Sequence, residues 1–238
     1  IEVFAASSDK YYLLDGESGQ VRQSLPAHVT LSGNVARLAQ ADLNLDGSPE
    51  LVLCSSNHCI CLASDLSLLW STELPGEHQY WNDIAVADLD NDGMVEVVVS
   101  ANGGLAVLAG ATGQIRWERF FNETTNWRSL AVGDSNRDGM MEIFVATYST
   151  VRAFTYDGNM LWSYNRSGPI TLITQADRAF ILIGIQRDLD CLDAASGQIL
   201  WSYYGPYYSS EKLAVADVAL PVEFHTTCPT AISKLLGR

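Results

Sequence analysis

Three short acidic segments carry the residues whose types and spacing predict metal chemistry. They read Asp42-Leu-Asn-Leu-Asp-Gly-Ser-Pro-Glu50, Asp88-Leu-Asp-Asn-Asp-Gly-Met-Val-Glu96 and Asp134-Ser-Asn-Arg-Asp-Gly-Met-Met-Glu142. In each segment, side chains that contain oxygen recur at positions 1, 3, 5 and 9, and glycine stands at position 6. Ca²⁺ takes roughly six to eight hard oxygens, from carboxylates and backbone carbonyls. The spacing therefore predicts three calcium sites.

The predicted ligands are the side chains at positions 1, 3, 5 and 9 and the backbone carbonyl at position 7. They are Asp42, Asn44, Asp46, Ser48 and Glu50 in the first loop, Asp88, Asp90, Asp92, Met94 and Glu96 in the second, and Asp134, Asn136, Asp138, Met140 and Glu142 in the third. An EF-hand carries a bidentate glutamate at position 12, where this chain has Leu53, Val99 or Val145. We therefore expect sites between strands, with no EF-hand.

A plain Asx turn is the alternative interpretation of each loop. The three loops together hold ten carboxylates, and carboxylates crowded into one loop repel each other unless a cation compensates. We therefore favour bound ions that stabilise the fold and perform no chemistry. The second loop, with four acidic ligands, is predicted to bind most tightly. The shortened equivalents at 176–179 and 217–221 are predicted to bind no ion.

Short strands must position these loops. The first aspartates of the three loops are 46 residues apart both times, and a tryptophan recurs at a similar spacing, at positions 70, 117, 162 and 201. Each loop precedes a short apolar run that is typical of a strand. A period of roughly 40–50 residues with several strands is typical of propeller blades. We predict an all-β fold, a β-propeller of four-stranded antiparallel blades with the tryptophans packed between neighbours.

We expect about five blades in this chain, with membership of a larger propeller as the alternative. A single domain over residues 1–238 would divide into blades at approximately 1–25 (partial), 35–75, 81–121, 127–166, 169–204 and 211–238 (partial). Residues 1–25 supply the late strands of a blade and residues 211–224 the early ones. We therefore expect the two ends of the chain to lie close together.

The acidic loops resemble the FG-GAP/VCBS repeats of integrin α-like calcium-binding propellers. The Gly-Gln turn followed by a tryptophan strand, as at Gly113-Gln114 and Trp117, resembles the PQQ-like propeller repeat. The resemblance implies structural metal loops and a partner that binds at one face of the propeller. A quinoprotein dehydrogenase would also need eight blades and an adjacent Cys-Cys pair, which this sequence lacks.

The composition excludes two classes of partner. With 28 acidic and 14 basic residues, the chain has a formal net charge of −14, which disfavours a nucleic-acid groove and a polybasic membrane patch. The longest uninterrupted apolar stretch, about 179–183, is far shorter than the roughly 20 residues of a membrane helix. We predict no nucleic-acid partner and no membrane insertion within this chain.

The sequence does not predict an enzyme. It has no Gly-x-Ser-x-Gly turn, and its four histidines share no motif with a serine or cysteine. Zinc is disfavoured at His58 and Cys59 because neighbouring strand residues point to opposite faces. Cys54 and Cys59 flank a short turn and are placed for a disulfide in an oxidising compartment, whereas Cys61 and Cys191 align as buried thiols.

Two sequons, at Asn122 and Asn165, follow tryptophan strands at equivalent positions and predict glycosylation. Together with calcium, they favour an extracellular or cell-surface protein that acts in adhesion, protein–protein interaction or structural assembly. Its partner would be a protein or glycan at one face, with a larger assembly left open. The alternative is a carbohydrate-binding or polysaccharide-cleaving propeller (lectin or lyase-like), whose sugar-stacking aromatics would be Tyr80, Trp81, Trp127, Tyr203, Tyr204, Tyr207 and Tyr208.

Overall fold

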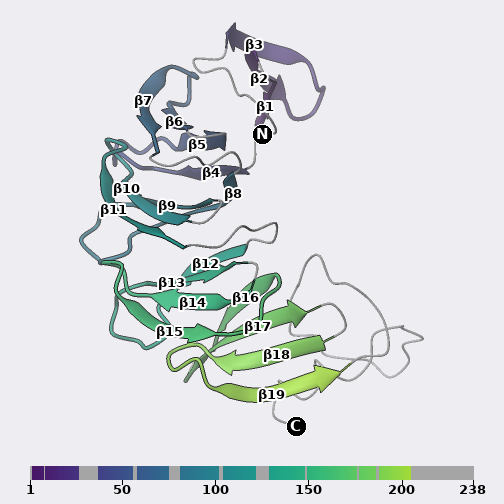
Figure 1. Cartoon of the computed structure of the whole chain (residues 1–238). Helices are drawn as coiled ribbons and strands as arrows, with labels where there is room; N and C mark the ends of the chain where they lie inside the picture. Colours follow the sequence, from purple (N-terminus) through teal and green to yellow (C-terminus); the bar gives the residue numbers. More distant parts are fainter. Residues whose placement is uncertain are drawn as a thin grey trace.

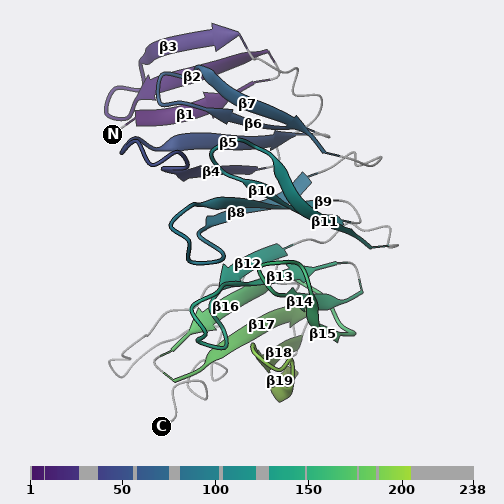
Figure 2. The same cartoon turned by 90° about the vertical axis from the view of Figure 1, so that its left-hand side faces the viewer.

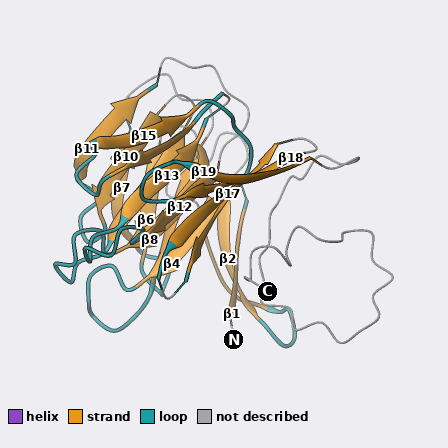
Figure 3. Ribbon diagram, turned by 90° about the horizontal axis from the view of Figure 1, so that it is seen from below, coloured by secondary structure: helices purple, strands orange, loops and turns teal. Residues whose placement is uncertain are grey.

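The computed structural model describes residues 2–7, 9–26, 37–55, 58–74, 81–101, 104–121, 129–147, 149–175, 177–185 and 188–204. The regular structure of this part of the chain consists of strands (Figure 3). Among these residues there is no helix with the length and apolarity that a membrane span needs.

The strands form five sheets. The first contains β1 (Glu2–Ala6), β2 (Lys10–Asp15) and β3 (Val21–Pro26). The second contains β4 (Arg37–Ala41), β5 (Glu50–Ser55), β6 (His58–Leu62) and β7 (Leu68–Glu73). The third contains β8 (Trp81–Ala87), β9 (Glu96–Ala101), β10 (Gly104–Ala109) and β11 (Ile115–Phe120). The fourth contains β12 (Ser129–Gly133), β13 (Glu142–Ala146), β14 (Val151–Phe154) and β15 (Met160–Tyr164). The fifth contains β16 (Ile170–Thr174), β17 (Ala179–Ile185), β18 (Asp188–Asp193) and β19 (Ile199–Tyr204).

Each sheet is antiparallel, and its strands follow one another in chain order. The sheets are stacked face to face along an arc, with β1–β3 at one end and β16–β19 at the other (Figures 1 and 2). The first strands of successive sheets contact one another, β4 with β8, β8 with β12 and β12 with β16. This confirms the predicted all-β fold of antiparallel blades. The expected pairing of residues 1–25 with 211–224 lies outside the described residues, and the single-domain division stays a prediction.

The core lies between the sheets, which explains why the second strand of a blade carries apolar side chains on both faces. In β9, Val97 and Val99 belong to the cluster shared with Val52 of the second sheet. Val98, which points to the opposite face, belongs to the cluster shared with Ile143 of the fourth sheet. Alternate residues of one strand therefore pack on two different neighbours, so no polar face is needed.

The tryptophans connect neighbouring sheets, as predicted. The indole N–H of Trp70 donates to the Gly110 carbonyl at 2.7 Å, and that of Trp117 to the Tyr156 carbonyl at 2.8 Å. The indole N–H of Trp162 donates to the carbonyl of Ala194 at 2.9 Å. Each hydrogen bond crosses to the following sheet. The neighbour predicted for Trp201 would follow residue 204 and lies outside the described residues.

A β-bulge recurs at the same place in all five sheets. The register of the last two strands shifts by one residue, between Leu13 and Leu14 in the first sheet and between Val107 and Leu108 in the third. One residue of the last strand is thereby left without a partner across the ladder. The bulged residues are Arg22, Leu69, Arg116, Leu161 and Leu200. A bulge breaks the alternation of side chains and re-aims the extra one.

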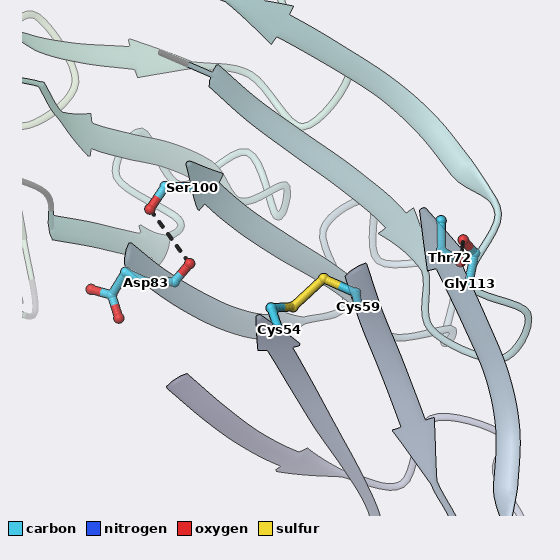
Figure 4. Close-up of a disulfide and its surroundings, with 6 residues drawn as sticks. All are labelled: Cys54, Cys59, Thr72, Asp83, Ser100 and Gly113. Atoms are coloured by element: carbon cyan, nitrogen blue, oxygen red, sulfur yellow. Dashed lines mark hydrogen bonds between the residues drawn. A yellow bond between two sulfur atoms is a disulfide. The ribbon is translucent and has the colours of Figure 1, made fainter. Parts of the chain in front are cut away.

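Cys54 and Cys59 form a disulfide that joins the adjoining ends of β5 and β6 (Figure 4). The same view shows two other polar contacts, Ser100 Oγ donating to the Asp83 carbonyl at 3.4 Å and Thr72 Oγ1 to the Gly113 carbonyl at 2.7 Å. Cys61 and Cys191 are free and buried. Burial raises the pKa of both thiols to about 12, so they remain protonated at neutral pH.

Candidate calcium-binding loops

Each acidic loop connects the first and second strands of its sheet, β4 to β5, β8 to β9 and β12 to β13. The three loops share one backbone conformation. The residue at position 4, Leu45, Asn91 or Arg137, has a positive φ of 61°, 57° or 68°. Glycine at position 6 has φ near 87° in all three, for example 87° at Gly93, a conformation that other residues rarely adopt. This pair of left-handed residues produces a sharp turn in each loop.

The aspartate at position 1 accepts hydrogen bonds from the backbone of its own loop. In the second loop, Asp88 Oδ1 accepts from the N–H of Asp92 at 3.1 Å and Asp88 Oδ2 from the N–H of Gly93 at 2.9 Å. Asp42 makes the same two bonds in the first loop, whereas Asp134 Oδ1 in the third loop accepts from the N–H of position 4, Arg137, and its Oδ2 from Gly139. These bonds span three to five residues, whereas the Asx turns of each loop are made at position 5, so the turn interpretation describes part of each loop correctly.

The aspartate at position 5 accepts from the N–H at position 7. The donors are Ser48, Met94 and Met140, at 2.8, 2.7 and 2.8 Å from Asp46, Asp92 and Asp138. The Ser48 N–H and the Asn44 amide hold the pKa of Asp46 below its usual range. Carbonyl ligation by Ser48, Met94 and Met140 stays a prediction.

The glutamate at position 9 is buried, although it starts a strand beside a solvent-exposed loop. Glu50, Glu96 and Glu142 are 1%, 0% and 2% exposed. In each, Oε2 accepts the backbone N–H of loop position 2, at 2.7, 2.9 and 2.8 Å. Its other oxygen, Oε1, faces the acidic side chains of the loop. An Asx turn requires no buried carboxylate, and a carboxylate taken out of water needs a compensating charge or hydrogen bonds.

The compensating group differs between the loops. In the first loop, Asn44 Nδ2 donates to Glu50 Oε1 at 3.2 Å and to Asp46 Oδ2 at 3.1 Å. In the third loop, Asn136 Nδ2 donates to Glu142 Oε1 at 3.1 Å and to Asp138 Oδ2 at 3.0 Å. The predicted ligand residues at positions 3, 5 and 9 are thus brought together in both loops, with the amide nitrogen of position 3 toward the carboxylates.

The second loop is the most acidic and combines Asp88, Asp90 and Glu96 with ligand atoms within 4.8 Å of one another. Among the described residues, Asp90 Oδ1 and Glu96 Oε1 are buried and accept no hydrogen bond. Burial raises the pKa of Glu96, as do the charges of Asp90 and Asp92, against the opposing effects of the Leu89 N–H and Arg116. Carboxylate oxygens that converge on one point, with one arginine beside them, are a donor set that suits a hard divalent cation.

Sequence reasoning missed one residue of this site, Arg116. Its Nη1 lies 3.0 Å from Asp90 Oδ2 and 3.0 Å from Glu96 Oε1, and its Nη2 lies 3.8 Å from Asp92 Oδ2. The available signal was an arginine where the second, fourth and fifth sheets have Leu69, Leu161 and Leu200. That signal has meaning only once the bulge has aimed residue 116 toward the loop.

The loops of neighbouring sheets are also in contact. The Met141 N–H of the third loop donates to the Leu89 carbonyl of the second at 2.8 Å. The shortened segment of the fifth sheet instead carries an exposed ion pair, Arg178 Nε to Asp177 Oδ2 at 3.5 Å. Its counterpart at residues 217–221 lies outside the described residues.

The remaining predicted positions are only partly described. Asn165 follows β15 and is exposed, whereas Asn122 lies outside the described residues. Among the aromatic candidates, Tyr203 and Tyr204 are 37% and 70% exposed on β19. Tyr80, Trp127, Tyr207, Tyr208 and the side chain of Trp81 are outside the described part.

Comparison with known proteins agrees with this architecture. Residues 88–145, which contain the second and third loops, match the model of the FG-GAP-like repeat. No curated protein matched the chain.

Solved structures of propeller type share the fold. One is the V. cholerae biofilm matrix protein Bap1 (TM-score 0.61, 18% identity, 83% of this chain and 33% of that chain). Another is BBS1N, crystallised with ARL6DN (TM-score 0.61, 17% identity, 87% and 65%). A third is Saccharomyces cerevisiae Sqt1 (TM-score 0.62, 15% identity, 90% and 62%). This chain thus spans between one third and two thirds of their lengths, and at these identities the likeness establishes the fold alone.

Proposed function

We propose that this chain is a calcium-stabilised, non-catalytic propeller segment that works outside the cell and presents a rigid surface to a partner protein. Each acidic loop would hold one Ca²⁺ through the carboxylate and amide oxygens at positions 1, 3, 5 and 9. The ion would supply the positive charge that the crowded carboxylates need and would fix the link between two strands. Because it would serve the backbone, it requires no open position for a substrate.

The observation that carries this proposal is that the glutamate at position 9 is buried in all three loops. Glu50, Glu96 and Glu142 each use one oxygen to hold the loop backbone and direct the other at the acidic side chains of the same loop. In the second loop, Asp90 Oδ1 and Glu96 Oε1 remain without a hydrogen bond among the described residues. An Asx turn explains neither feature, whereas a bound cation explains both.

Four features support the extracellular setting and the protein partner. The disulfide of Cys54 and Cys59 is typical of an oxidising compartment, and the exposed Asn165 lies in a glycosylation sequon. Weak calcium loops are occupied outside cells, where extracellular modules have dissociation constants of roughly 10⁻⁴–10⁻³ M. Propeller-type neighbours include a biofilm matrix protein and a protein crystallised with a partner.

Metal analysis and thermal unfolding test the proposal. We expect three calcium ions per chain and a lower melting temperature in EGTA, because an ion at ten times its dissociation constant adds about 1.4 kcal/mol per site. Asp92→Ala should remove one ion and part of the shift. Asp177→Ala, at an exposed acidic residue outside the loops, should change neither. A melting temperature that is unchanged by the chelator would overturn the proposal.

A glycan is the second candidate partner, because Tyr204 is 70% exposed beside Tyr203 at the end of β19. Exposed aromatic rings of this kind can stack on sugar faces. A glycan array should then give binding that Tyr204→Ala abolishes. Binding that survives this change would assign the glycan to another surface.

A further inference from the structure

We propose that Arg116 is a built-in counter-ion of the second loop, which a calcium ion must displace in order to bind. This inference rests on the calcium sites proposed above and concerns how one of them is regulated. It assigns the second loop a lower affinity than its four carboxylates alone suggest. Arg116 and the bulge that presents it thereby become part of the metal site.

The contacts of Arg116 coincide with the predicted ligand set. Its guanidinium reaches Asp90, Glu96 and Asp92, with nitrogen-to-oxygen distances of 3.0, 3.0 and 3.8 Å. Three of the four carboxylates that would surround an ion are therefore already paired with one positive charge. A divalent cation and the guanidinium cannot both contact these oxygens, because two positive charges so close together repel each other.

The other two loops show what Arg116 replaces. There the amide of Asn44 or Asn136 donates to the carboxylates at positions 5 and 9. In the second loop, position 3 is Asp90, which has no amide donor. Arg116 donates a hydrogen bond to Asp90 Oδ2 and places its positive charge beside the carboxylates of the same two positions, Asp92 and Glu96. Asparagine at position 3 thus accompanies leucine at the bulge, and aspartate at position 3 accompanies arginine.

The charges balance in the same way. The first and third loops each contain three carboxylates among their predicted ligands, and the second contains four. Counted over these ligand side chains alone, the second set together with Arg116 has the same net charge as the other two. Its extra carboxylate therefore adds little to the attraction for calcium while Arg116 is in place.

The bulge explains how a strand residue reaches the loop. Trp117 pairs with Val107 and Ile115 with Leu108, so Arg116 lies between two ladder pairs and is not fixed to either sheet face. The first sheet repeats the arrangement, because the bulged Arg22 pairs with Glu2 at 2.9 Å. Leu69, Leu161 and Leu200 occupy the bulge elsewhere and are 45%, 44% and 45% exposed, so a longer side chain fits there.

Calcium titration of a protein in which only the second loop can bind the ion tests the proposal. Asp42→Asn with Asp134→Asn disables the first and third loops, and CaCl₂ is titrated into this protein by calorimetry. Adding Arg116→Leu should tighten binding by about tenfold, since it removes a cation in direct contact with the ligands. The control is Arg178→Leu, which removes the same charge from an exposed site in the fifth sheet and should leave the affinity within about twofold.

The reciprocal experiment uses the third loop and does not depend on the folding of the Arg116 variant. With Asp42→Asn and Asp88→Asn in place, Leu161→Arg should weaken calcium binding several-fold. In EDTA, Arg116→Leu should also lower the melting temperature of the otherwise unchanged protein, whereas in excess calcium it should raise it. A purely structural ion pair would lower the melting temperature in both buffers.

The outcomes separate this inference from the calcium proposal. If the loops bind calcium but neither Arg116→Leu nor Leu161→Arg changes the dissociation constant, the proposed role of Arg116 is wrong and the proposed calcium sites stand. An absence of calcium binding in the unmodified protein and in every variant would overturn both. Tightening by Arg116→Leu together with weakening by Leu161→Arg supports the inference.

Discussion

The indole of Trp162 lies directly on Gly197 of the following sheet. A Cβ added to Gly197 would stand 2.5 Å from Cδ2 of Trp162, closer than non-bonded atoms approach. The same relationship joins Trp70 to Gly113 and Trp117 to Gly158, where the added Cβ would stand 2.5 and 2.9 Å from the ring. The glycine turn and the tryptophan strand therefore recur together because each packs on its counterpart in the adjacent repeat.

Gly197→Ala should destabilise the protein by about 3 kcal/mol, because the methyl group displaces the Trp162 indole and its hydrogen bond to Ala194. Chemical unfolding measures the change. Gly19→Ala is the matched control, with φ of 68° against 70° at Gly197 and nothing within 4 Å of the added Cβ. It should cost about 1 kcal/mol from backbone strain alone. Equal losses in the two variants would show that the ring contact is unimportant.

Leu45→Asn should stabilise the protein by about 0.5–1 kcal/mol. Leu45 has φ of 61° and is 56% exposed, so it bears the strain of a left-handed conformation without burying its side chain. Asparagine tolerates this conformation and already occupies position 4 of the second loop as Asn91. Leu68→Asn, at an exposed strand residue with ordinary backbone geometry, should be neutral or destabilising. A loss of stability in Leu45→Asn would contradict the strain explanation.

Asp190→Asn should destabilise the protein by about 3 kcal/mol, because Asp190 is fully buried between the fourth and fifth sheets. Its Oδ2 accepts from the Tyr164 hydroxyl at 2.9 Å and from Arg166 Nη1 at 2.8 Å. Asp188 pairs with the other side of Arg166 but is 25% exposed, and Asp188→Asn should cost less than about 1 kcal/mol. Unfolding free energies of the two variants, measured at pH 7, give the comparison directly.

The titration of Tyr164 provides a pH-dependent prediction. Burial, and then the hydrogen bond to Asp190 and its charge, raise the pKa of this hydroxyl in the folded protein. A group whose pKa is raised by folding stabilises below its unfolded pKa, which is about 10 for tyrosine, and loses this contribution as pH rises through the folded pKa. Stability should therefore fall more steeply above pH 10 in the unmodified protein than in Tyr164→Phe. Parallel pH profiles would contradict the assignment.

Reduction of the Cys54–Cys59 disulfide should destabilise the protein by about 2 kcal/mol, since a crosslink across so short a loop removes little chain entropy. The melting temperature with and without reductant measures this. Cys54→Ala with Cys59→Ala should abolish the dependence on reductant. Cys61→Ala, at a free buried thiol, should leave it unchanged.

Repeat spacing was enough to predict the sheets, because short apolar runs follow acidic loops that recur at a 46-residue spacing and so indicate the same strand order in each repeat. The acidic loops were predictable for the same reason. The role of Arg116 was not predictable, because a bulge shifts the register by one residue and the sequence pattern does not show which side chain the bulge redirects. Asp190 was also missed, because its partner Arg166 lies 24 residues earlier, in the connection between the fourth and fifth sheets.

The contact of Trp162 with Gly197 also determines how such a chain can change in length. The hydrogen-bonded sheet is not the self-contained module, because its tryptophan is completed by a turn that belongs to the next repeat. After duplication or deletion of a whole repeat, wherever the cut falls, every tryptophan ring still packs on a glycine and every indole N–H still has a carbonyl acceptor. A rearrangement that is not a whole number of repeats leaves one tryptophan without its glycine. Genes of this kind should therefore gain or lose sequence in steps of about one repeat.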